Sequence, residues 1–550
     1  MLPAAVTSSS SDTPSPAGPA ATFGLSLGSI TKTVSLSPFG LSLAVSTGEK
    51  AAPTPAAAQA SALLAGKAAC LQDPKGSLAS WVAGMDHCSS WKGLKCDEKT
   101  GLVKELDLEG AGLAGCLPKE WAALTSLEEL KLKKNSLTGT IPTEWSQLVN
   151  LQEINLKGNK LTGQLPADWS KLVNLQELNL ADNALTGPLP AAWSALGSLQ
   201  EMILAGNQLS GELPSGWSAL TKLEKLQLSK NKLTGQLPAA WSALASLQEL
   251  ILAGNRGLGG PLPSGWWAMR SLQDLSLGGN QHTGPLPAEW SALRALKKLK
   301  LGGNKLTGPL PASWSALKNL EELDLGGNQL TGQLPAGWSV LASLQELDLS
   351  KNALTGQLPA AWGALKKLEE LDLVKNKLSG PLPAAWAQLA SLEELDVSNN
   401  SLTGPLPAAM ASLSKLEELE LQHNNFQGTV PQEWSALKSL EELSLFENPG
   451  LKGCLPASFK AQEVELGRPK GSSSSSSSKD ADEEKFADDK DDREKGKAKG
   501  KEKGKDAQDA PGAGGQKRTK GKDKGKDKQK EGGAAVVAAA VVNTGLSGWC

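Results

Sequence analysis

The sequence has no tyrosine and no long apolar run. Its 550 residues include six phenylalanines but 17 tryptophans. Even the apolar stretch at 534–542 is about half of the ~20 residues that a membrane-spanning helix needs. We therefore expect a chain without a transmembrane segment.

Cysteine is also scarce, because six residues are too few for a disulfide scaffold in a chain this long. Cys88 and Cys96 lie close enough in the sequence to pair locally. Cys116 and Cys454 occupy equivalent places near opposite ends of a repeat array, so they cannot pair with each other. Four cysteines are left without an evident pairing, namely Cys70, Cys116, Cys454 and Cys550.

Residues suited to catalysis are few. The three histidines, His87, His282 and His423, do not recur with a serine, cysteine or carboxylate in a catalytic arrangement. No phosphate-binding glycine loop and no kinase signature is present. Carboxylates suited to Ca²⁺ exist, but their spacing is regular rather than convergent. We therefore predict a protein that is not an enzyme and has no metal or cofactor.

Composition divides the chain into four parts. A leader rich in Ser, Ala and Pro has no basic start or uninterrupted apolar segment typical of a secretion signal, and it cannot bury a core. A short compact unit precedes a repeat array, and a charged tail follows it. The predicted boundaries are 1–60 for a disordered leader, 61–102 for the compact unit, 103–467 for about fifteen repeats and 468–550 for a disordered tail.

The tail contains three kinds of low-complexity sequence. A run of seven serines (472–478) precedes an acidic stretch (480–494) and a Lys-rich stretch (495–530). Blocks of like charge interspersed with Gly do not form a packed core. A basic stretch could bind nucleic acid or an anionic membrane, but this one includes acids and lacks aromatics. We therefore expect no nucleic-acid binding.

A sequence of 24 residues recurs along the array, with the pattern L-x-x-L-x-L-x-x-N-x-L-T-G-x-L-P-x-x-W-x-x-L-x-x. Alternation in the L-x-L portion predicts a short strand with leucines pointing inward. Strands at a fixed period stack about 4.8 Å apart into a parallel sheet. A solenoid of stacked coils is therefore predicted.

Each predicted strand is followed by an asparagine. An amide side chain both donates and accepts, so a column of asparagines can satisfy backbone groups in the turns of successive coils. Losing one would leave buried groups unpaired, at about 1–3 kcal/mol. The column consists of Asn135, Asn159, Asn183, Asn207, Asn231, Asn255, Asn280, Asn304, Asn328, Asn352, Asn376, Asn400, Asn424 and Asn448.

A large apolar residue follows each Pro turn. A tryptophan column could in principle form a platform for sugars or nucleobases. Because the position is always large and apolar and lies between the turn and the next core leucine, we favour a buried column. Met410 and Phe459 replace tryptophan in two repeats, and the other members are Trp121, Trp145, Trp169, Trp193, Trp217, Trp241, Trp266, Trp290, Trp314, Trp338, Trp362, Trp386 and Trp434.

These motifs resemble those of plant-type leucine-rich repeat proteins, whose repeat reads LxxLxLxxNxLxGxIPxxL. Tryptophan in place of Ile or Leu is a departure from that pattern. The resemblance implies an α/β solenoid, a right-handed superhelix with a parallel β-sheet on its concave face and loops or short 3-10 turns on its convex face. It also implies that the LTGxLP portion forms a second, smaller sheet.

The unit at 61–102 resembles the N-terminal cap of the same family, through ALLAGKAACLQDPKGSLASW (62–81) and CSSWKGLKC (88–96). By that resemblance Cys88 and Cys96 form a disulfide, and Trp81 and Trp91 pack against the first coil. The C-terminal end departs from the family, because one cysteine follows the last repeat and the usual second cap disulfide is not expected.

The resemblance implies binding on the concave face, and variable residues there indicate the ligand. Acidic residues recur before the second leucine, and from the tenth repeat the next outward position is acidic too. Such neighbours repel each other unless a cation or basic partner neutralises them. Mid-array residues are apolar instead. The predicted ligand-binding residues are Ile203, Ala205, Ile251, Ala253, Glu322, Asp324, Glu346, Asp348, Glu370, Asp372, Glu394, Asp396, Glu418 and Glu420.

We predict a non-enzymatic binding protein for a protein or peptide, basic in character. The Lys-rich tail is a candidate competitor for the same acidic residues, since tethering raises its effective concentration. Two alternatives stay open: an intracellular scaffold of a cytoskeletal or ciliary assembly, and a truncated receptor-like ectodomain. A cap disulfide favours an extracellular or secretory location over the cytoplasm or axoneme.

Overall fold

The structure is a computed structural model. It describes residues 53–456, 458 and 459, and the backbone of five short strands at 24–27, 30–33, 35–37, 40–42 and 465–466. The chain forms two compact units, 1–234 and 235–550, and each is described by itself.

The leader differs from the unstructured segment that we predicted. It contains two antiparallel hairpins, β1 (Gly24–Leu27) with β2 (Ile30–Thr33) and β3 (Ser35–Ser37) with β4 (Gly40–Ser42). Helix α1 (Pro55–Ala69) begins before the predicted boundary at residue 61. Thr54 caps it by accepting the N–H of Ala57, and Pro55 supplies the fixed φ favoured in a first turn.

The N-terminal cap consists of α1, β5 (Leu71–Gln72), α2 (His87–Ser90) and β6 (Leu94–Cys96). The Cys88–Cys96 disulfide is present, as predicted. The Trp81 ring stacks on Trp91 at 5.5 Å between centroids and lies 6.4 Å from Trp121 in the first coil, which confirms the expected packing.

A second disulfide in the cap corrects the sequence reading. Cys70, for which we found no partner, is bonded to Cys116. This bond joins the end of α1 to β8 (Ala114–Cys116) in the first coil. Cys454 is disulfide-bonded as well, so a bond is present in the last repeat where none was expected. Cys550 lies outside the described residues.

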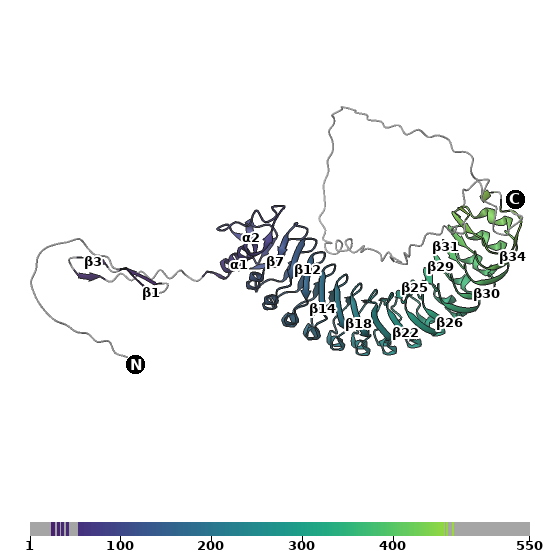
Figure 1. Ribbon diagram of the computed structural model, residues 1–550, viewed down its shortest axis with the longest axis horizontal. Coiled ribbons are helices and arrows are strands. Elements are labelled where there is room, and N and C mark those ends of the chain that lie inside the picture. Colours follow the sequence, from purple (N-terminus) through teal and green to yellow (C-terminus); the bar gives the residue numbers. More distant parts are fainter. Residues whose placement is uncertain are drawn as a thin grey trace, which may run out of the picture. The chain divides into compact units, whose positions relative to one another are not determined.

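The coils share one plan. An inner strand, of three residues in most coils, is followed by the Asn turn, an outer strand of five residues in most coils, and a short 3-10 helix. Inner and outer strands form separate parallel sheets, so the second sheet implied by the resemblance is present, with longer strands than the first. In the second unit, the inner strands line the inner side of the arc and the outer strands its outer side (Figure 1).

In the first unit the inner sheet begins with the antiparallel pair β6 and β7 and continues in parallel. Its strands after β6 are β7 (Val103–Asp107), β9 (Glu129–Lys131), β11 (Glu153–Asn155), β13 (Glu177–Asn179), β15 (Glu201–Ile203) and β17 (Lys225–Gln227). The outer strands after β5 are β8, β10 (Ser136–Thr140), β12 (Lys160–Gln164), β14 (Ala184–Pro188), β16 (Gln208–Glu212) and β18 (Lys232–Gln236). The 3-10 helices are η1 (Lys119–Ala123), η2 (Thr143–Gln147), η3 (Ala167–Lys171), η4 (Ala191–Ala195) and η5 (Ser215–Ala219).

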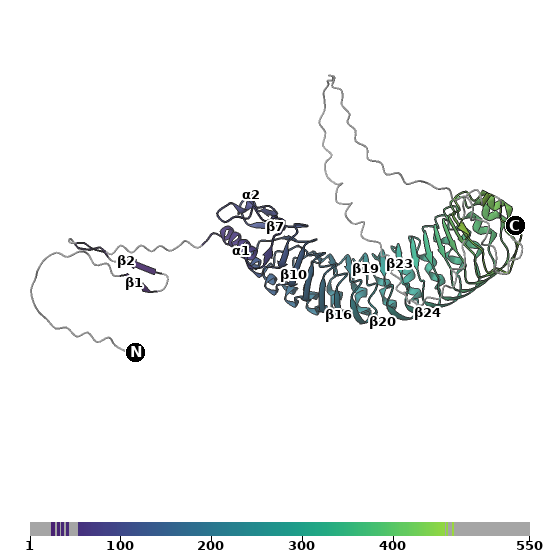
Figure 2. The ribbon, with the colours of Figure 1, turned by 45° about the horizontal axis from the view of Figure 1, so that its top comes forward.

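In the second unit, β19 and β23 lie on the opposite side of the coils from β20 and β24 (Figure 2). The inner strands are β19 (Glu249–Ile251), β21 (Asp274–Ser276), β23 (Lys298–Lys300), β25 (Glu322–Asp324), β27 (Glu346–Asp348), β29 (Glu370–Asp372), β31 (Glu394–Asp396), β33 (Glu418–Glu420), β35 (Glu442–Ser444) and β37 (Glu465–Leu466). The outer strands are β20 (Gly257–Pro261), β22 (Gln281–Pro285), β24 (Lys305–Pro309), β26 (Gln329–Gln333), β28 (Ala353–Gln357), β30 (Lys377–Pro381), β32 (Ser401–Pro405), β34 (Asn425–Thr429) and β36 (Gly450–Lys452). The 3-10 helices are η6 (Ala239–Ala243), η7 (Ser264–Ala268), η8 (Ala288–Ala292), η9 (Ala312–Ala316), η10 (Ala336–Val340), η11 (Ala360–Ala364), η12 (Ala384–Gln388), η13 (Ala408–Ser412) and η14 (Gln432–Ala436).

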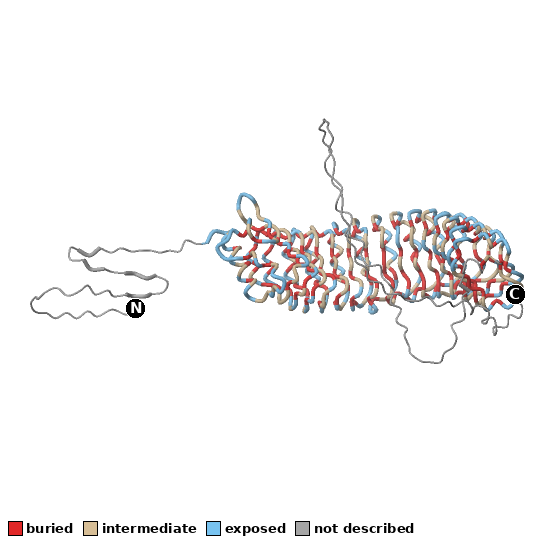
Figure 3. The backbone as a smooth tube through the Cα atoms, turned by 90° about the horizontal axis from the view of Figure 1, so that it is seen from above, coloured by how far each residue is buried: buried red, intermediate tan, exposed pale blue. Residues whose placement is uncertain are grey.

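The tryptophan column is buried, as predicted. Buried residues recur along the coils (Figure 3), and the tryptophans of the column are at most 1% exposed. Neighbouring rings are nearly parallel, with centroids 6.4 Å apart for Trp314 and Trp338. Since strands of a sheet repeat at about 4.8 Å, the wider spacing at the indoles bends each unit toward its inner strands.

The indole nitrogens also join successive coils. Nε1 of Trp338 donates to the carbonyl of Pro311 at 3.1 Å, and Trp362 donates in the same way to Pro335 at 3.0 Å. Trp145 and Trp434 repeat this bond near the two ends of the array. Most tryptophans of the column therefore belong to the core and also link successive coils, whereas Nε1 of Trp121 and of Trp169 has no hydrogen-bond partner. The sequence predicted only the first role.

The asparagine column satisfies the turns as predicted. Nδ2 of Asn328 donates to the carbonyl of Leu325 in its own coil and to that of Leu301 in the preceding coil. Its Oδ1 accepts the N–H of Leu306 at 3.0 Å. One side chain therefore pairs three backbone groups that a turn would otherwise leave unsatisfied.

At the far end of the second unit, Phe459 is 3% exposed and takes the tryptophan position of the last coil. Strand β37 pairs with β35 in parallel. These two features follow the last complete coil and cover part of the core that it would expose.

Candidate binding face

Acidic side chains gather on the inner strands of the second unit. The parallel register places each member beside its equivalent on the next strand, as with Glu346 beside Glu370 and Asp348 beside Asp372. Equivalent residues on neighbouring strands lie about 5 Å apart. We call the following side chains the acidic ladder: Glu322, Asp324, Glu346, Asp348, Glu370, Asp372, Glu394, Asp396, Glu418 and Glu420.

The aspartates of the ladder are held by their own turns. Oδ1 of Asp348 accepts the N–H of Ser350 at 2.7 Å, and Oδ1 of Asp396 accepts that of Ser398 at 2.7 Å. The glutamates have no such backbone partner, and Glu370 remains exposed. The ladder therefore has aspartates that are hydrogen-bonded to their own turns beside glutamates that lack such a bond.

Two glycines, Gly302 and Gly326, lie beside the ladder. An added Cβ at Gly302 would lie 2.5 Å from the Asp324 carboxylate, and one at Gly326 would lie within 3 Å of the Asp348 carboxylate. These glycines make room for aspartates of the following coil, so the space is already occupied.

Burial and mutual repulsion oppose ionisation of the ladder. Although the Glu370 side chain is exposed in part, the partial burial of its carboxyl group, reinforced by the charge of Glu394, raises its pKa to about 7. Burial also raises the pKa of Asp372 to about 6, with Asp348 adding to it, and that of Asp396 to about 7. Ionising the ladder carboxyl groups at neutral pH therefore costs free energy, and a cationic ligand would lower that cost.

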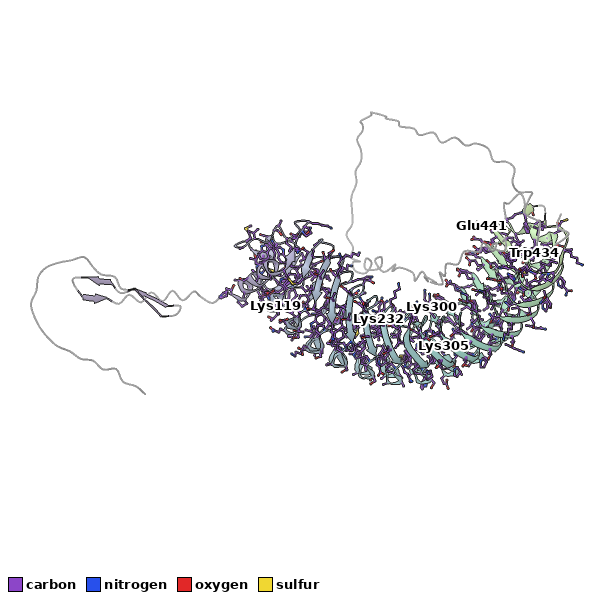
Figure 4. All side chains as sticks on the ribbon, viewed as in Figure 1. Lys119, Lys232, Lys300, Lys305, Trp434 and Glu441 are labelled. Carbon is purple, nitrogen blue, oxygen red and sulfur yellow. A yellow bond between two sulfur atoms is a disulfide. The ribbon has the colours of Figure 1, made fainter. Side chains whose placement is uncertain are left out.

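Two lysines on β23 neutralise the first member of the ladder. Nζ of Lys300 lies 2.5 Å from a carboxylate oxygen of Glu322, and Nζ of Lys298 lies 3.3 Å from the other. Although burial opposes them, they hold the pKa of Glu322 below its usual range. Figure 4 shows Lys300 on the inner side of the arc, whereas Lys305 belongs to an outer strand. The unneutralised part of the ladder begins at Glu346.

The predicted apolar residues are divided between the two units. Ile203 and Ala205 belong to the first unit and are half-buried, whereas Ile251 and Ala253 belong to the second. Ala253 is only 1% exposed, so it is removed from the surface that a ligand could touch. Ile251 remains half-buried on β19. The candidate site is therefore the ladder itself.

The histidines do not form a catalytic group. His87 lies beside the disulfide cysteines of the cap. His282 is fully buried, and neither of its ring nitrogens has a hydrogen-bond partner. Nδ1 of His423 lies 2.7 Å from Glu447 at an exposed turn. His87 belongs to the first unit, and His282 and His423 belong to different coils of the second.

Family models match most of the array and the cap. The model described as Leucine rich repeat matches 102–161, 270–330, 342–402 and 390–449, and a shorter one of the same description matches 174–196, 198–220 and 222–244. The Leucine rich repeat N-terminal domain matches 56–97. The chain belongs to the leucine-rich repeat family.

Solved structures show that this leucine-rich repeat protein is of the plant type. The structure of a TDR receptor is 34% identical, with a TM-score of 0.64, over 66% of this chain and 62% of that one. The ectodomain of the Arabidopsis receptor kinase HAESA, in complex with an IDA peptide hormone, is 30% identical over 73% of this chain and 79% of that one, with a TM-score of 0.55. The plant peptide hormone receptor RGFR1, in complex with RGF2, is 29% identical over 68% and 70%, with a TM-score of 0.59.

No curated protein sequence matches this leucine-rich repeat chain significantly. The chain spans about 62% of the TDR receptor chain that it matches. Among the described residues, none of the helices has both the length and the apolar character needed to cross a membrane.

One charged feature was missed by the sequence reading. Arg270, Arg294 and Lys318 occupy the position four residues after the column tryptophan in three successive coils. Comparing that position between repeats would have found them, but only the strand positions were compared. The predicted tail residues 468–550 lie outside the described residues.

Proposed function

We propose that this leucine-rich repeat protein is a non-enzymatic receptor or binding module whose inner face, from β27 to β33, holds a basic peptide or a basic segment of a protein. Support comes first from its relatives, since RGFR1 and HAESA are receptors solved with peptide hormones. The ladder supplies the chemistry, because it places a double column of carboxylates on neighbouring strands.

The raised pKa values of Glu370 and Asp396 are the observation that carries the proposal. Burial, with added repulsion from neighbouring carboxylates, raises these pKa values, and lysine or arginine side chains placed along the ladder would offset both effects. Ligand binding would then lower these pKa values. Near neutral pH a basic ligand would therefore displace protons from the ladder carboxyl groups that are still protonated, whereas the carboxylates that are already ionised would release none.

The lysines at one end give the site a direction. Because Lys298 and Lys300 already pair with Glu322, a cationic ligand is repelled from β23 and attracted from β27 onward. A ligand with its cationic residues at one end would therefore bind in one orientation.

The Lys-rich stretch 495–530 is a tethered competitor in this proposal. It holds many lysines and is covalently joined to the unit that carries the ladder. A flexible tether of moderate length supplies a local concentration on the order of 1 mM. An external ligand would bind more weakly while this stretch occupies the ladder.

The test uses the full chain with the lysines of 495–530 changed to Gln, and a synthetic peptide of residues 495–530 as the probe. The ladder variant combines Glu370→Gln, Asp372→Asn, Glu394→Gln and Asp396→Asn. If each lost pairing is worth about 0.5 kcal/mol, the four changes raise the Kd about 30-fold in calorimetric titration.

The matched control changes four glutamates that precede the inner strands, Glu369, Glu393, Glu417 and Glu441, to Gln. It removes the same net charge from another column, so its Kd should rise far less. Equal weakening by the two variants would reject the ladder as the site. The same probe should bind the native-tail chain more weakly, and equal affinity would reject the competitor.

A further inference from the structure

A basic edge interrupts the acidic second unit. Residues 256–320 contain eight Lys or Arg and two Asp or Glu, whereas residues 321–447 contain seven Lys or Arg and 18 Asp or Glu. Four exposed side chains lie between the 3-10 helices and the inner strands of neighbouring coils. We call them the basic edge: Arg270, Arg294, Lys297 and Lys318.

Trp267 lies on the basic edge and differs from every other tryptophan of the described residues. It follows the column residue Trp266, where other coils have mostly serine, and its side chain is 40% exposed. The Arg270 guanidinium carbon lies 5.5 Å from the centre of its ring, in a cation–π arrangement. Tryptophan and arginine are the residues that most often dominate protein interfaces.

The cations of the basic edge have no acidic partner among the described residues. Lys318 donates weakly to the carbonyl of Val340, at 3.4 Å. On the neighbouring strand, by contrast, Lys298 and Lys300 are both paired with Glu322. Unpaired cations beside an exposed indole fit a ligand that is anionic and contains an aromatic or apolar residue.

We propose that the basic edge and Trp267 bind the acidic stretch 480–494 of the same chain. That stretch has nine acidic and three basic residues, with Phe486 at its centre. Its carboxylates would pair with the cations, and Phe486 would pack against the exposed face of Trp267. Acidic side chains spaced along an extended segment can form ion pairs with Arg270, Arg294 and Lys318 in successive coils.

The connecting chain is long enough. From Pro456 to Asp480 there are 24 residues, which span up to about 80 Å when extended. Seven coils separate the turn at Pro287 from that at Pro456, which at the indole spacing of 6.4 Å is about 45 Å. Docking of 480–494 would leave the following Lys-rich stretch tethered to the same unit, yet it uses a different surface from the acidic ladder.

The test measures acrylamide quenching of Trp267 fluorescence in the full chain. Trp549→Phe removes the one tryptophan outside the described residues, which leaves Trp267 as the exposed fluorophore. A tail variant changes the nine acids of 480–494 to their amides, which cannot disturb the packing of the coils. With a local concentration on the order of 1 mM and a Kd of about 0.5 mM, Trp267 is covered about two-thirds of the time, so quenching rises about threefold in the variant at low salt.

At 1 M NaCl, acrylamide should quench Trp267 in the native-tail chain as strongly as in the amide-tail variant. The Debye length falls to about 3 Å at this salt concentration, so the attraction between the acidic stretch and the basic edge is screened. Trp267→Phe should abolish the quenchable component in both chains. Changing lysines of 495–530 to Gln should leave Trp267 protected, which separates this inference from the proposed competition at the ladder. Equal quenching of Trp267 in the native-tail and amide-tail chains at low salt would overturn the inference.

Discussion

At the scale of single residues, the indole N–H explains why tryptophan occupies the large apolar position. Leucine or phenylalanine would fill the core, but neither can donate to the proline carbonyl of the preceding coil, as Trp338 does to Pro311. That carbonyl also accepts the backbone N–H of Trp314, so it serves two coils.

Trp338→Phe should therefore lower the free energy of unfolding by about 1–3 kcal/mol, through a lost hydrogen bond and unfilled volume. Met410→Trp is the reverse case, because it introduces a donor opposite Pro383. It should raise stability. Urea midpoints measured at constant slope check both changes, and an unchanged midpoint in the Phe variant would contradict the role of the bond.

His282 is the residue that most clearly violates the repeat. It lies fully buried in a position that is leucine in most repeats and phenylalanine at Phe426, and burial lowers its pKa. Since the unfolded histidine takes up its proton at a higher pH than the folded one, stability is complete above about pH 6.5 and declines as the pH falls below that value.

His282→Leu should raise the free energy of unfolding by about 1–3 kcal/mol, because it removes two buried ring nitrogens that have no hydrogen-bond partner. The gain should grow between pH 6.5 and pH 5. Urea denaturation across this range measures it, with Leu306→His in the next coil as the converse variant. A pH-independent gain would contradict the titration argument.

At the scale of elements, the inner strands of the second unit are coupled through their turns. The carboxylate of Asp324 leans over Gly302 of the preceding coil while it accepts the N–H of Gly326. The aspartate of one coil thus requires glycine at the neighbouring position of the preceding coil.

Gly302→Ala should displace Asp324 and cost about 1 kcal/mol, since its hydrogen bond to the turn is charge-assisted. Gly337 in η10 offers the matched control, because no atom lies within 4 Å of an added Cβ there. Gly337→Ala should be neutral or stabilising by about 0.5–1 kcal/mol. Equal loss of stability in the two variants would remove the argument.

The acidic ladder gives the inner strands a pH dependence of opposite sign to that of His282. The pKa values of Glu370 and Asp396 rise to about 7 in the folded state, so the folded chain binds more protons than the unfolded chain between about pH 4 and 7. The stability of β29 and β31 should therefore increase as the pH falls from 8 to 5. Amide exchange protection, corrected for intrinsic rates, measures this, and Glu370→Gln with Asp396→Asn should flatten it.

At the scale of the whole molecule, the features that repeat in every coil could be predicted from the sequence, whereas the features that depart from the repeat could not. The spacing of Asn328 and its equivalents predicted the turns, the strands and the buried tryptophans, because each coil can stack on its neighbours only if these positions recur in register. The Cys70–Cys116 bond could not be predicted, since it depends on where α1 ends relative to the first coil. The ladder was predicted from its register, but the role of Gly302 required side-chain positions.

The asparagines of the column and most of its tryptophans donate backward along the chain. Trp338 and Asn328 both donate to carbonyls of the coil made before their own. The acceptors for the side-chain amide and the indole N–H of a newly synthesised coil are therefore already present when that coil leaves the ribosome. These side-chain donors need no coil that is synthesised later. Assembly can proceed in the order of translation, with the disulfide-bonded cap as the template on which the first turn is laid.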